Sequence, residues 1–351
     1  MDVASRINQI KQEAEQLKAQ IREKKEQAAD TTLGNATSSC APVALPKIAP
    51  RRALKGHMGK IYSMDTAAEG TSLVSAGQDG VLIVWEGLSA HKTHAIPLRS
   101  AWVMSTCMAP SGNYVASGGM DNFVTVFNLN SQDMPIPPCR EMEGHGAQVT
   151  DMSFISDSKL LSSGDERCLL WDIENNKIIT EFSGHLGDVN CLSLSPDKNS
   201  FVSGSVDATA RLFDIRDGRQ SQLTFDAPES DVMAVEFMPT GNAFATGEDK
   251  DAARLFDLRA GVCLSTYRVD RRAGVTSVAF TKSGRVMFTS YEDDGATKRG
   301  GGIIRVWDTL KGNQLQEFKA HKDCYISSIG VTGDGRALAT ASWDMTVKIF
   351  S

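Results

Sequence analysis

The sequence GHLGDVNCLSLSPD occupies residues 184–197 and is followed by FVSGSVD at 201–207 and ARLFDI at 210–215. Apolar and polar residues alternate in each run, and turn-forming Pro, Asp and Ser residues separate the runs. This pattern predicts three short strands of an antiparallel sheet. Similar text recurs along almost the whole chain of 351 residues, so we expect a fold built from copies of one unit.

Seven repeats can be counted from the aromatic residue and its neighbour that close the third run of each repeat. These pairs are Trp85-Glu86, Phe127-Asn128, Trp171-Asp172, Phe213-Asp214, Phe256-Asp257, Trp307-Asp308 and Phe350-Ser351. They lie 42 to 51 residues apart, and a fourth run, such as residues 177–182, follows each pair except the last. Four strands at this period are typical of a propeller blade, so the sequence predicts an all-β, seven-bladed β-propeller of four-stranded blades.

The last repeat ends directly after its third run, which would leave its sheet with an unpaired edge. The missing run is found before the first repeat, where residues 51–55 precede a Gly-His pair just as residues 180–183 precede Gly184-His185. We therefore expect residues 51–55 to pair with the last blade and to close a propeller domain of residues 51–351.

Residues 1–29 carry one narrow apolar seam without Gly or Pro. The seam consists of Val3, Ile7, Ile10, Ala14, Leu17, Ile21 and Ala28. Steps of four and three residues, broken at Lys24, predict a coiled-coil helix with one partner helix. The alternative is a helix that packs against the chain's own body. Residues 30–50 are rich in Thr, Ser and Ala, contain three prolines, and are predicted to be a linker.

Composition and the absence of targeting motifs narrow the class of protein. A net charge of −6 offers no general attraction for nucleic acid. The chain has no apolar run of membrane-spanning length and no secretory or lipidation motif. Its seven cysteines lack C-x-x-C spacing, which is typical of thiols in a reducing compartment. We expect a cytoplasmic protein that has no cofactor. It should reach membranes only through its partners.

The first repeat contains His57, Ser75, Asp79 and Trp85, and three of these residue types could form a hydrolase triad. The equivalents are His185, Ser203 and Asp207 in the fourth repeat and His321, Thr340 and Asp344 in the seventh. Because an enzyme needs only one such site, we interpret these sets as structural hydrogen-bond networks within the blades. The third repeat is predicted to lack the hydroxyl, with Leu161 at its position. The histidines belong to separate blades and are not expected to bind a metal.

The first strand of each repeat begins with a β-branched core residue, such as Val189 in the fourth repeat. The residues on either side of this core position vary from repeat to repeat. Their side chains should point away from the core, on the same face as the turns after the second strand. The predicted face contains Tyr62, Trp102, Met104, Met120 and Trp343, ringed by Lys60, Asp188 and Asp231, with Glu248 among the turn residues. An apolar centre with a charged rim is typical of a protein interface. The alternative is that each aromatic side chain packs locally.

The sixth repeat contains a glycine-rich insertion at residues 294–302. Asp294 lies thirteen residues before Trp307, whereas Asp79 lies six residues before Trp85. Strand text, not a helix, follows the insertion, so it lacks the helix N-terminus of a phosphate-binding loop. We interpret it as a flexible loop.

Four segments make this sequence similar to the β subunits of heterotrimeric G proteins. They are QEAEQLK at 12–18, AIPLRSAWVM at 95–104, APSGNYVA at 109–116 and GNAFATG at 241–247. The resemblance covers essentially the full length and implies a non-catalytic signal transducer built from WD repeats. In that family, the N-terminal helix forms a coiled coil with a small prenylated γ subunit, and one propeller face binds the GDP-bound α subunit. GTP exchange releases α, and the freed face binds effectors.

The resemblance implies that the apolar seam binds γ and that specific residues bind α and effectors. The implied α and effector surface is Met58, Lys60, Tyr62, Lys92, Trp102, Met104, Met120, Asn122, Asp188, Asp231 and Trp343. Gln148 is a further predicted residue of this surface, although the family commonly has Tyr there, and the insertion is absent from the common form. Comparison of the repeats adds Asn190 as a candidate. The family also implies coupling to a receptor at the inner face of the plasma membrane.

Two other classes compete with this interpretation. A general WD-repeat scaffold, such as a substrate adaptor, is disfavoured by the N-terminal seam and by residues 96–104. A propeller enzyme is disfavoured because the sequence offers no convergent set of ionisable groups.

Overall fold

The computed structural model describes residues 6, 9, 12–13, 16–17, 19–21, 23–24, 33–43, 47–68, 70–216, 220–227, 230–250, 252–268, 273–292, 301–322 and 324–351. The chain divides into two compact units, Met1–Pro42 and Val43–Ser351, which are described separately.

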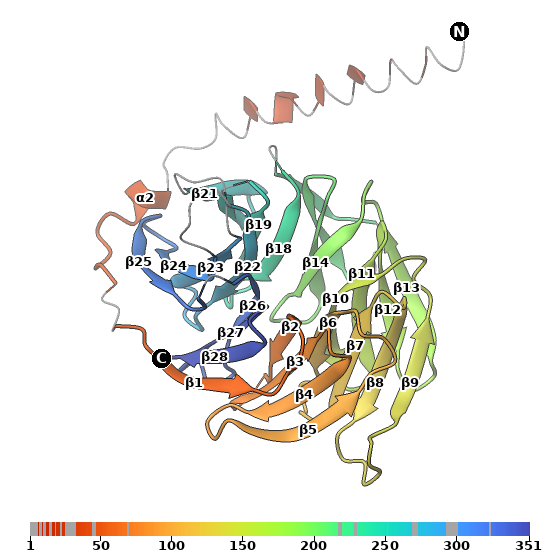
Figure 1. Cartoon of the computed structure of the whole chain (residues 1–351). Coiled ribbons are helices and arrows are strands. Elements are labelled where there is room, and N and C mark those ends of the chain that lie inside the picture. Colours follow the sequence, from red (N-terminus) through yellow and green to blue (C-terminus); the bar gives the residue numbers. More distant parts are fainter. Residues whose placement is uncertain are drawn as a thin grey trace. The chain divides into compact units, whose positions relative to one another are not determined.

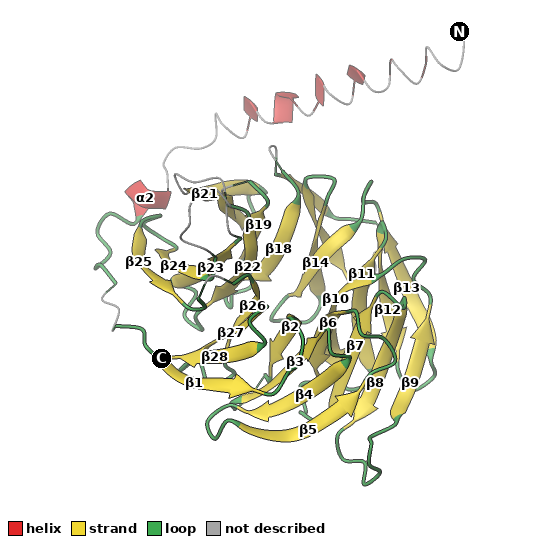
Figure 2. Cartoon of the chain, viewed as in Figure 1, coloured by secondary structure: helices red, strands yellow, loops and turns green. Residues whose placement is uncertain are grey.

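Strands and their connecting loops make up the second unit (Figure 2), and the described strands form seven antiparallel sheets of four strands each. The first sheet contains β2 (Ile61–Thr66), β3 (Ser72–Gly77), β4 (Val81–Glu86) and β5 (His91–Pro97). The second contains β6 (Val103–Met108), β7 (Tyr114–Gly119), β8 (Phe123–Asn128) and β9 (Pro138–Glu143). The third contains β10 (Val149–Ser156), β11 (Lys159–Gly164), β12 (Arg167–Asp172) and β13 (Lys177–Ser183).

The remaining sheets repeat this order. The fourth contains β14 (Val189–Leu194), β15 (Ser200–Ser205), β16 (Thr209–Asp214) and β17 (Leu223–Asp226). The fifth contains β18 (Val232–Phe237), β19 (Ala243–Glu248), β20 (Ala252–Asp257) and β21 (Val262–Arg268). The sixth contains β22 (Val275–Phe280), β23 (Val286–Tyr291), β24 (Ile303–Asp308) and β25 (Gln314–Lys319). The seventh contains β26 (Ile326–Val331), β27 (Leu338–Ser342), β28 (Thr346–Phe350) and β1 (Pro50–Lys55).

The seven sheets follow one another around a common centre, with the first strand of each sheet innermost (Figure 1). These inner strands are β2, β6, β10, β14, β18, β22 and β26. Each contacts the inner strand of the next sheet, and β26 contacts β2, so the ring is closed. The seven-bladed propeller predicted from the repeats is confirmed.

The outer strand of the seventh blade comes from the start of the unit. β1 pairs antiparallel with β28, and Leu54 lies opposite Val347. Both side chains are buried, in one cluster with Ile61 of β2. A slip by one residue would turn Leu54 to solvent, so its burial helps to set the register of this pairing.

The core lies between neighbouring blades. Val74 and Leu82 of the first blade pack with Val115 and Phe127 of the second, and all four side chains are buried. Because each sheet is covered on both faces, its inner strands carry apolar residues on both faces. Each blade therefore needs both of its neighbours to bury its core.

The described residues between Arg6 and Lys24 are helical. Two of them belong to the predicted seam, and their side chains are open to solvent: Leu17 is 58% exposed and Ile21 is 55% exposed. The seam residues Val3, Ile7, Ile10, Ala14 and Ala28 lie outside the described residues. A short helix, α2 (Leu33–Ala36), lies within the predicted linker. Among the described residues, no helix is both long and apolar enough to span a membrane.

Candidate functional site

The histidine, serine, aspartate and tryptophan of the first blade form one hydrogen-bonded chain. His57 Nε2 lies 2.8 Å from Ser75 Oγ, and the indole N–H of Trp85 donates to the same oxygen at 2.8 Å. His57 Nδ1 lies 2.9 Å from Asp79 Oδ2. Burial lowers the pKa of His57, and the Asp79 carboxylate opposes this shift. The hydroxyl is fully buried behind the indole, so no substrate can reach it as a nucleophile.

The fourth and seventh blades repeat this chain without the indole. His185 lies 2.7 Å from Ser203 Oγ and 2.9 Å from Asp207. His321 lies 2.8 Å from Thr340 Oγ1 and 2.7 Å from Asp344. Burial acts to raise the pKa of Asp207, but hydrogen bonds from His185, Thr209 and the Leu186 N–H lower it to a net value below its ordinary range. The networks connect the strands of single blades and lie apart from one another.

The predicted absence of the hydroxyl in the third blade is wrong. The residue at that position is Ser162, whose Oγ lies 2.6 Å from His145 Nε2 and accepts the indole N–H of Trp171 at 2.8 Å. Leu161 is its buried neighbour. The turn between β11 and β12 is one residue shorter than the turn between β3 and β4, so counting back from the closing tryptophan selected the wrong residue. In this blade His145 Nδ1 has no hydrogen-bond partner among the described residues.

Glu248 does not belong to the predicted face. Its side chain is fully buried at the end of β19 and pairs with Arg254 of β20, which is also buried. The cation of the neighbouring strand neutralises the carboxylate, and this is the condition under which a charged side chain can be buried.

A bulge at the start of every inner strand positions the predicted face. The pairing register shifts between Ile61 and Ser63, and at the equivalent point in each of the other six blades. Bulges leave one residue out of the ladder and redirect its side chain. The residues at these points include Tyr62, Met104 and Asn190, which are half-buried.

The centre of the face is an aromatic cluster from three blades. The Tyr62 and Trp102 rings stack with centroids 6.0 Å apart, and Tyr62 meets Trp343 edge to face at 6.2 Å. Lys60 Nζ lies 4.0 Å above the centre of the Trp343 ring. Trp102 itself is 44% exposed, and the other exposed apolar side chains of the predicted surface are Met58, at 89%, and Met120, at 54%. Asp188 is exposed and Asp231 half-buried beyond them. We call these eight residues the docking face.

The remaining predicted residues differ in their surroundings. Asn122 and Gln148 are half-buried in loops at the same ends of their blades as Met120 and Asp188. Asn190 donates to the carbonyl oxygen of Val232 at 3.1 Å, which ties it to the fifth blade. Lys92 lies on the outer strand β5, with Nζ 5.6 Å from the Trp85 ring centre, and so it is not part of the aromatic cluster. Of the insertion, residues 294–300 lie outside the described residues.

Three further apolar residues are exposed on this side, and the sequence comparison missed one of them, Leu186. Leu186 is 83% exposed, Val206 39% and Met233 38%. Leu186 directly follows His185 as Met58 follows His57, and this equivalence was the signal that could have identified it. These side chains extend the apolar surface toward the fourth and fifth blades.

The centre of the ring holds a polar channel of about 440 Å³, lined by inner strands of all seven blades. Among the described residues, its lining includes Asp65, Asp151 and Glu236 but no cationic side chain. Burial raises the pKa of both aspartates to about 6 and that of Glu236 to about 8. Asp65 accepts the Met108 N–H at 2.8 Å and Asp151 accepts the Leu192 N–H at 2.9 Å, so each joins two blades. Across the described residues, no three His, Cys, Asp or Glu side chains are placed to hold a metal ion.

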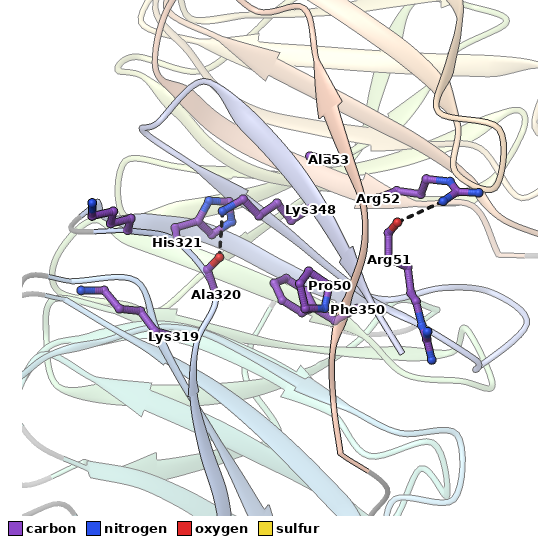
Figure 3. Close-up of a pocket in the computed structure, with 10 residues that line it drawn as sticks. Pro50, Arg51, Arg52, Ala53, Lys319, Ala320, His321, Lys348 and Phe350 are labelled. Carbon is purple, nitrogen blue, oxygen red and sulfur yellow. Dashed lines mark hydrogen bonds between the residues drawn. The ribbon is translucent and has the colours of Figure 1, made fainter.

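A second hollow, of about 510 Å³, lies between β1, β28 and the segment from Lys319 to Lys322 (Figure 3). It is rich in cations, but these side chains do not converge. Arg51 and Arg52 point to one side of β1 and Lys348 to the other (Figure 3). Lys348 Nζ donates to the carbonyl oxygen of Ala320 at 3.0 Å, which ties the seventh blade to the end of the sixth.

Comparison with known proteins identifies the family of this propeller. The family model described as "G protein beta WD-40 repeat protein" matches residues 4–351. The chain belongs to the G protein β family. It is 45% identical to the "Guanine nucleotide-binding protein subunit beta" of Dictyostelium discoideum, over 100% of this chain and 99% of that protein. It is also 45% identical to the "Guanine nucleotide-binding protein G(I)/G(S)/G(T) subunit beta-1" of Homarus americanus, over 98% of this chain and 99% of that protein.

Membership of the G protein β family decides between the three functional classes raised by the sequence. Proteins of this family are WD-repeat propellers without catalytic activity, so the chain is a signal transducer and not an enzyme. The buried Ser-His-Asp sets agree with this assignment, because each is closed within its own blade.

Proposed function

We propose that this chain acts as the β subunit of a heterotrimeric G protein and binds the GDP-bound α subunit through its docking face. The observation that carries the proposal is the aromatic cluster of Tyr62, Trp102 and Trp343, in which residues of three blades meet, with Trp102 exposed, the other two rings half-buried and Lys60 against Trp343. Such a centre excludes water on contact and favours a tightly packed partner. The resemblance adds Met104, Asn122 and Lys92 to this surface, and comparison of the repeats adds Asn190, all as proposed contacts.

We further propose that residues 1–29 form a coiled coil with a γ subunit, that residues 30–50 link this helix to the propeller, and that residues 51–351 are the propeller domain. Support comes from the a and d spacing of the seam and from the exposure of Leu17 and Ile21. A prenyl group on γ would bring the dimer to the inner face of the plasma membrane. Receptor coupling would then occur at this membrane. Effectors would bind there through the docking face after α leaves.

The nucleotide dependence of α binding tests this function. The chain is purified with the proteins that accompany it, and binding to a Gα subunit is measured with GDP and with a non-hydrolysable GTP analogue. We expect a small isoprenylated helical protein to co-purify and Gα to bind at least tenfold more tightly with GDP. Equal binding in both nucleotides, or no small partner, would favour a general scaffold.

The seam is tested by the double variant Ile10→Asp, Leu17→Asp. Two buried charges at core positions of a coiled coil should abolish assembly with γ, because neither carboxylate would have a partner. The matched control is Lys11→Asp, Lys18→Asp, which adds the same acidic side chains on the polar face. Co-purification measures assembly, and circular dichroism checks the propeller. A dimer that survives the seam variant would contradict the coiled coil.

A further inference from the structure

Tyr325 occupies a position in the seventh blade that other blades use for the docking face. In those blades, the residue before the inner strand accepts a backbone hydrogen bond from the turn after the second strand. The acceptors and donors are Lys60 and Gln78, Trp102 and Met120, Asp188 and Val206, and Asp231 and Asp249. In the seventh blade Tyr325 accepts this bond from Trp343 at 3.0 Å. The sequence comparison covered only five blades at this column and therefore missed Tyr325.

The side chain of Tyr325 lies against Trp343. The two ring centroids are 4.5 Å apart with planes inclined at 33°. Ser342 Oγ donates to the Tyr325 carbonyl at 2.7 Å, so this carbonyl oxygen accepts hydrogen bonds from the last residue of β27 and from the first residue of the turn that follows it. Tyr62 and Lys60 contact the same indole from the first blade. Trp343 is thus held between two blades.

The indole N–H of Trp343 indicates what this arrangement serves. It is buried and has no hydrogen-bond partner among the described residues. A ring placed only for stability would gain from an acceptor, as the Trp85 indole does from Ser75. The ring of Trp343 is instead held by its neighbours in an orientation that leaves its donor without an acceptor among the described residues, and this cost is not explained by packing alone.

We propose that Tyr325 is a positioning residue of the docking face, which clamps Trp343 in the orientation in which its indole meets a partner. The inference deepens the proposed function and rests on it. Burial, and then the nearby Glu292 and Asp249, raise the pKa of Tyr325 to about 12, so its hydroxyl stays neutral in the cell. The clamp therefore acts through its ring and not through a charge.

The test compares Tyr325→Ala with Tyr325→Phe in the full chain bound to γ, with GDP-loaded Gα as the probe. Loss of the ring should weaken binding about fivefold, in the range of an aromatic pair, whereas Tyr325→Phe should stay within about twofold of the unchanged protein. Fluorine NMR of 5-fluorotryptophan at position 343 should change with Ala and not with Phe. Tyr114→Ala, half-buried at the opposite end of its blade, is the matched control for loss of a tyrosine.

A double-mutant cycle separates positioning from direct contact. In a Trp343→Ala background, Tyr325→Ala should cause no further loss of affinity, because the residue on which it acts is gone. The same fivefold loss in both backgrounds, or a Tyr325→Phe variant as weak as Tyr325→Ala, would overturn the inference. If Trp343→Ala and Asp188→Lys also leave Gα binding unchanged, the results contradict both the proposed docking face and the positioning role of Tyr325. If these two weaken binding and Tyr325→Ala does not, only the clamp is refuted.

Discussion

Trp85 closes the third strand of the first blade, and Trp343 lies in the turn between β27 and β28 of the last. The Trp85 side chain is 1% exposed, and its N–H donates to a serine that is itself bonded to His57. Trp343 is half-buried against tyrosines and a lysine, and its N–H is buried without an acceptor among the residues that the structure describes. One indole completes a network inside a blade, and the other is held at a surface.

The difference shows how one repeat can serve both stability and recognition. Side chains that follow the repeat, such as Trp85, find their partners within the same blade. Side chains that break it, such as Tyr62 and Trp343, find theirs across blades, where their contacts leave one side open. Variants of the first kind should therefore change the free energy of unfolding, and variants of the second kind should change partner affinity.

The largest effect is expected inside a blade. Asp207→Ala removes a carboxylate that holds His185, Thr209 and the Leu186 N–H, so it should lower the free energy of unfolding by about 3 kcal/mol. Asp165→Ala in the third blade is the matched variant. Asp165 accepts the Gly146 N–H at 2.7 Å but makes no hydrogen bond to His145, and its loss should cost about 1 kcal/mol. Urea unfolding measures both, and equal costs would contradict the role of the histidine bond.

The second effect is expected at the surface. Trp102→Ala removes the ring that stacks on Tyr62 and should weaken binding of GDP-loaded Gα about tenfold, or about 1.4 kcal/mol. Its unfolding free energy should change by less than that. Leu88→Ala is the control, since Leu88 is 70% exposed in the turn between β4 and β5, away from the docking face. Unaltered affinity of Trp102→Ala in calorimetry would remove this ring from the interface.

The third effect concerns the channel carboxylates, which belong to neither region. The folded chain raises the pKa of Glu236 from 4.5 to about 8, so the folded state holds a proton that the unfolded state has released. Stability from this group is therefore full below about pH 4.5 and is lost as the pH rises toward 8. Asp65 and Asp151, whose pKa values are raised to about 6, should likewise lower the stability as the pH rises toward 6.

Glu236→Gln removes the ionisation at the channel's most strongly shifted group. At pH 8 the variant should be more stable than the unchanged protein, and this advantage should be much smaller at pH 5. Thermal melting across this pH range measures the difference. Parallel curves for the two proteins would show that Glu236 does not titrate in this window.

The repeats were readable because strand alternation has a strict period and each blade must bury both faces. Because both faces of each blade are buried, Val189 and its equivalents lie in the core. The aromatic residues that close the third strands lie in the core as well. The turns obey no such rule. A turn shorter by one residue moved the third blade's hydroxyl from the predicted Leu161 to Ser162, and nothing in the local residue types marks that change.

The face was predictable as a set of positions, but the environment of each side chain was not. Residue type placed Glu248 on the surface, whereas its position at the end of β19 lets Arg254 neutralise it in the interior. Tyr325 needed the cross-strand bond to Trp343 to be identified. Such pairings depend on the three-dimensional neighbours of a residue, which repeat spacing does not specify.

The pairing of β1 with β28 has a consequence for synthesis. Arg51 Nε donates to Ser351 Oγ across 300 residues, so the first strand of the propeller must wait for its partner until β28 has left the ribosome. At about 5–20 residues per second this delay is roughly 15–60 s. During that time Leu54 lacks Val347, its partner on β28. The nascent chain must therefore stay soluble with its ring open, and a single late step joins its two most distant strands.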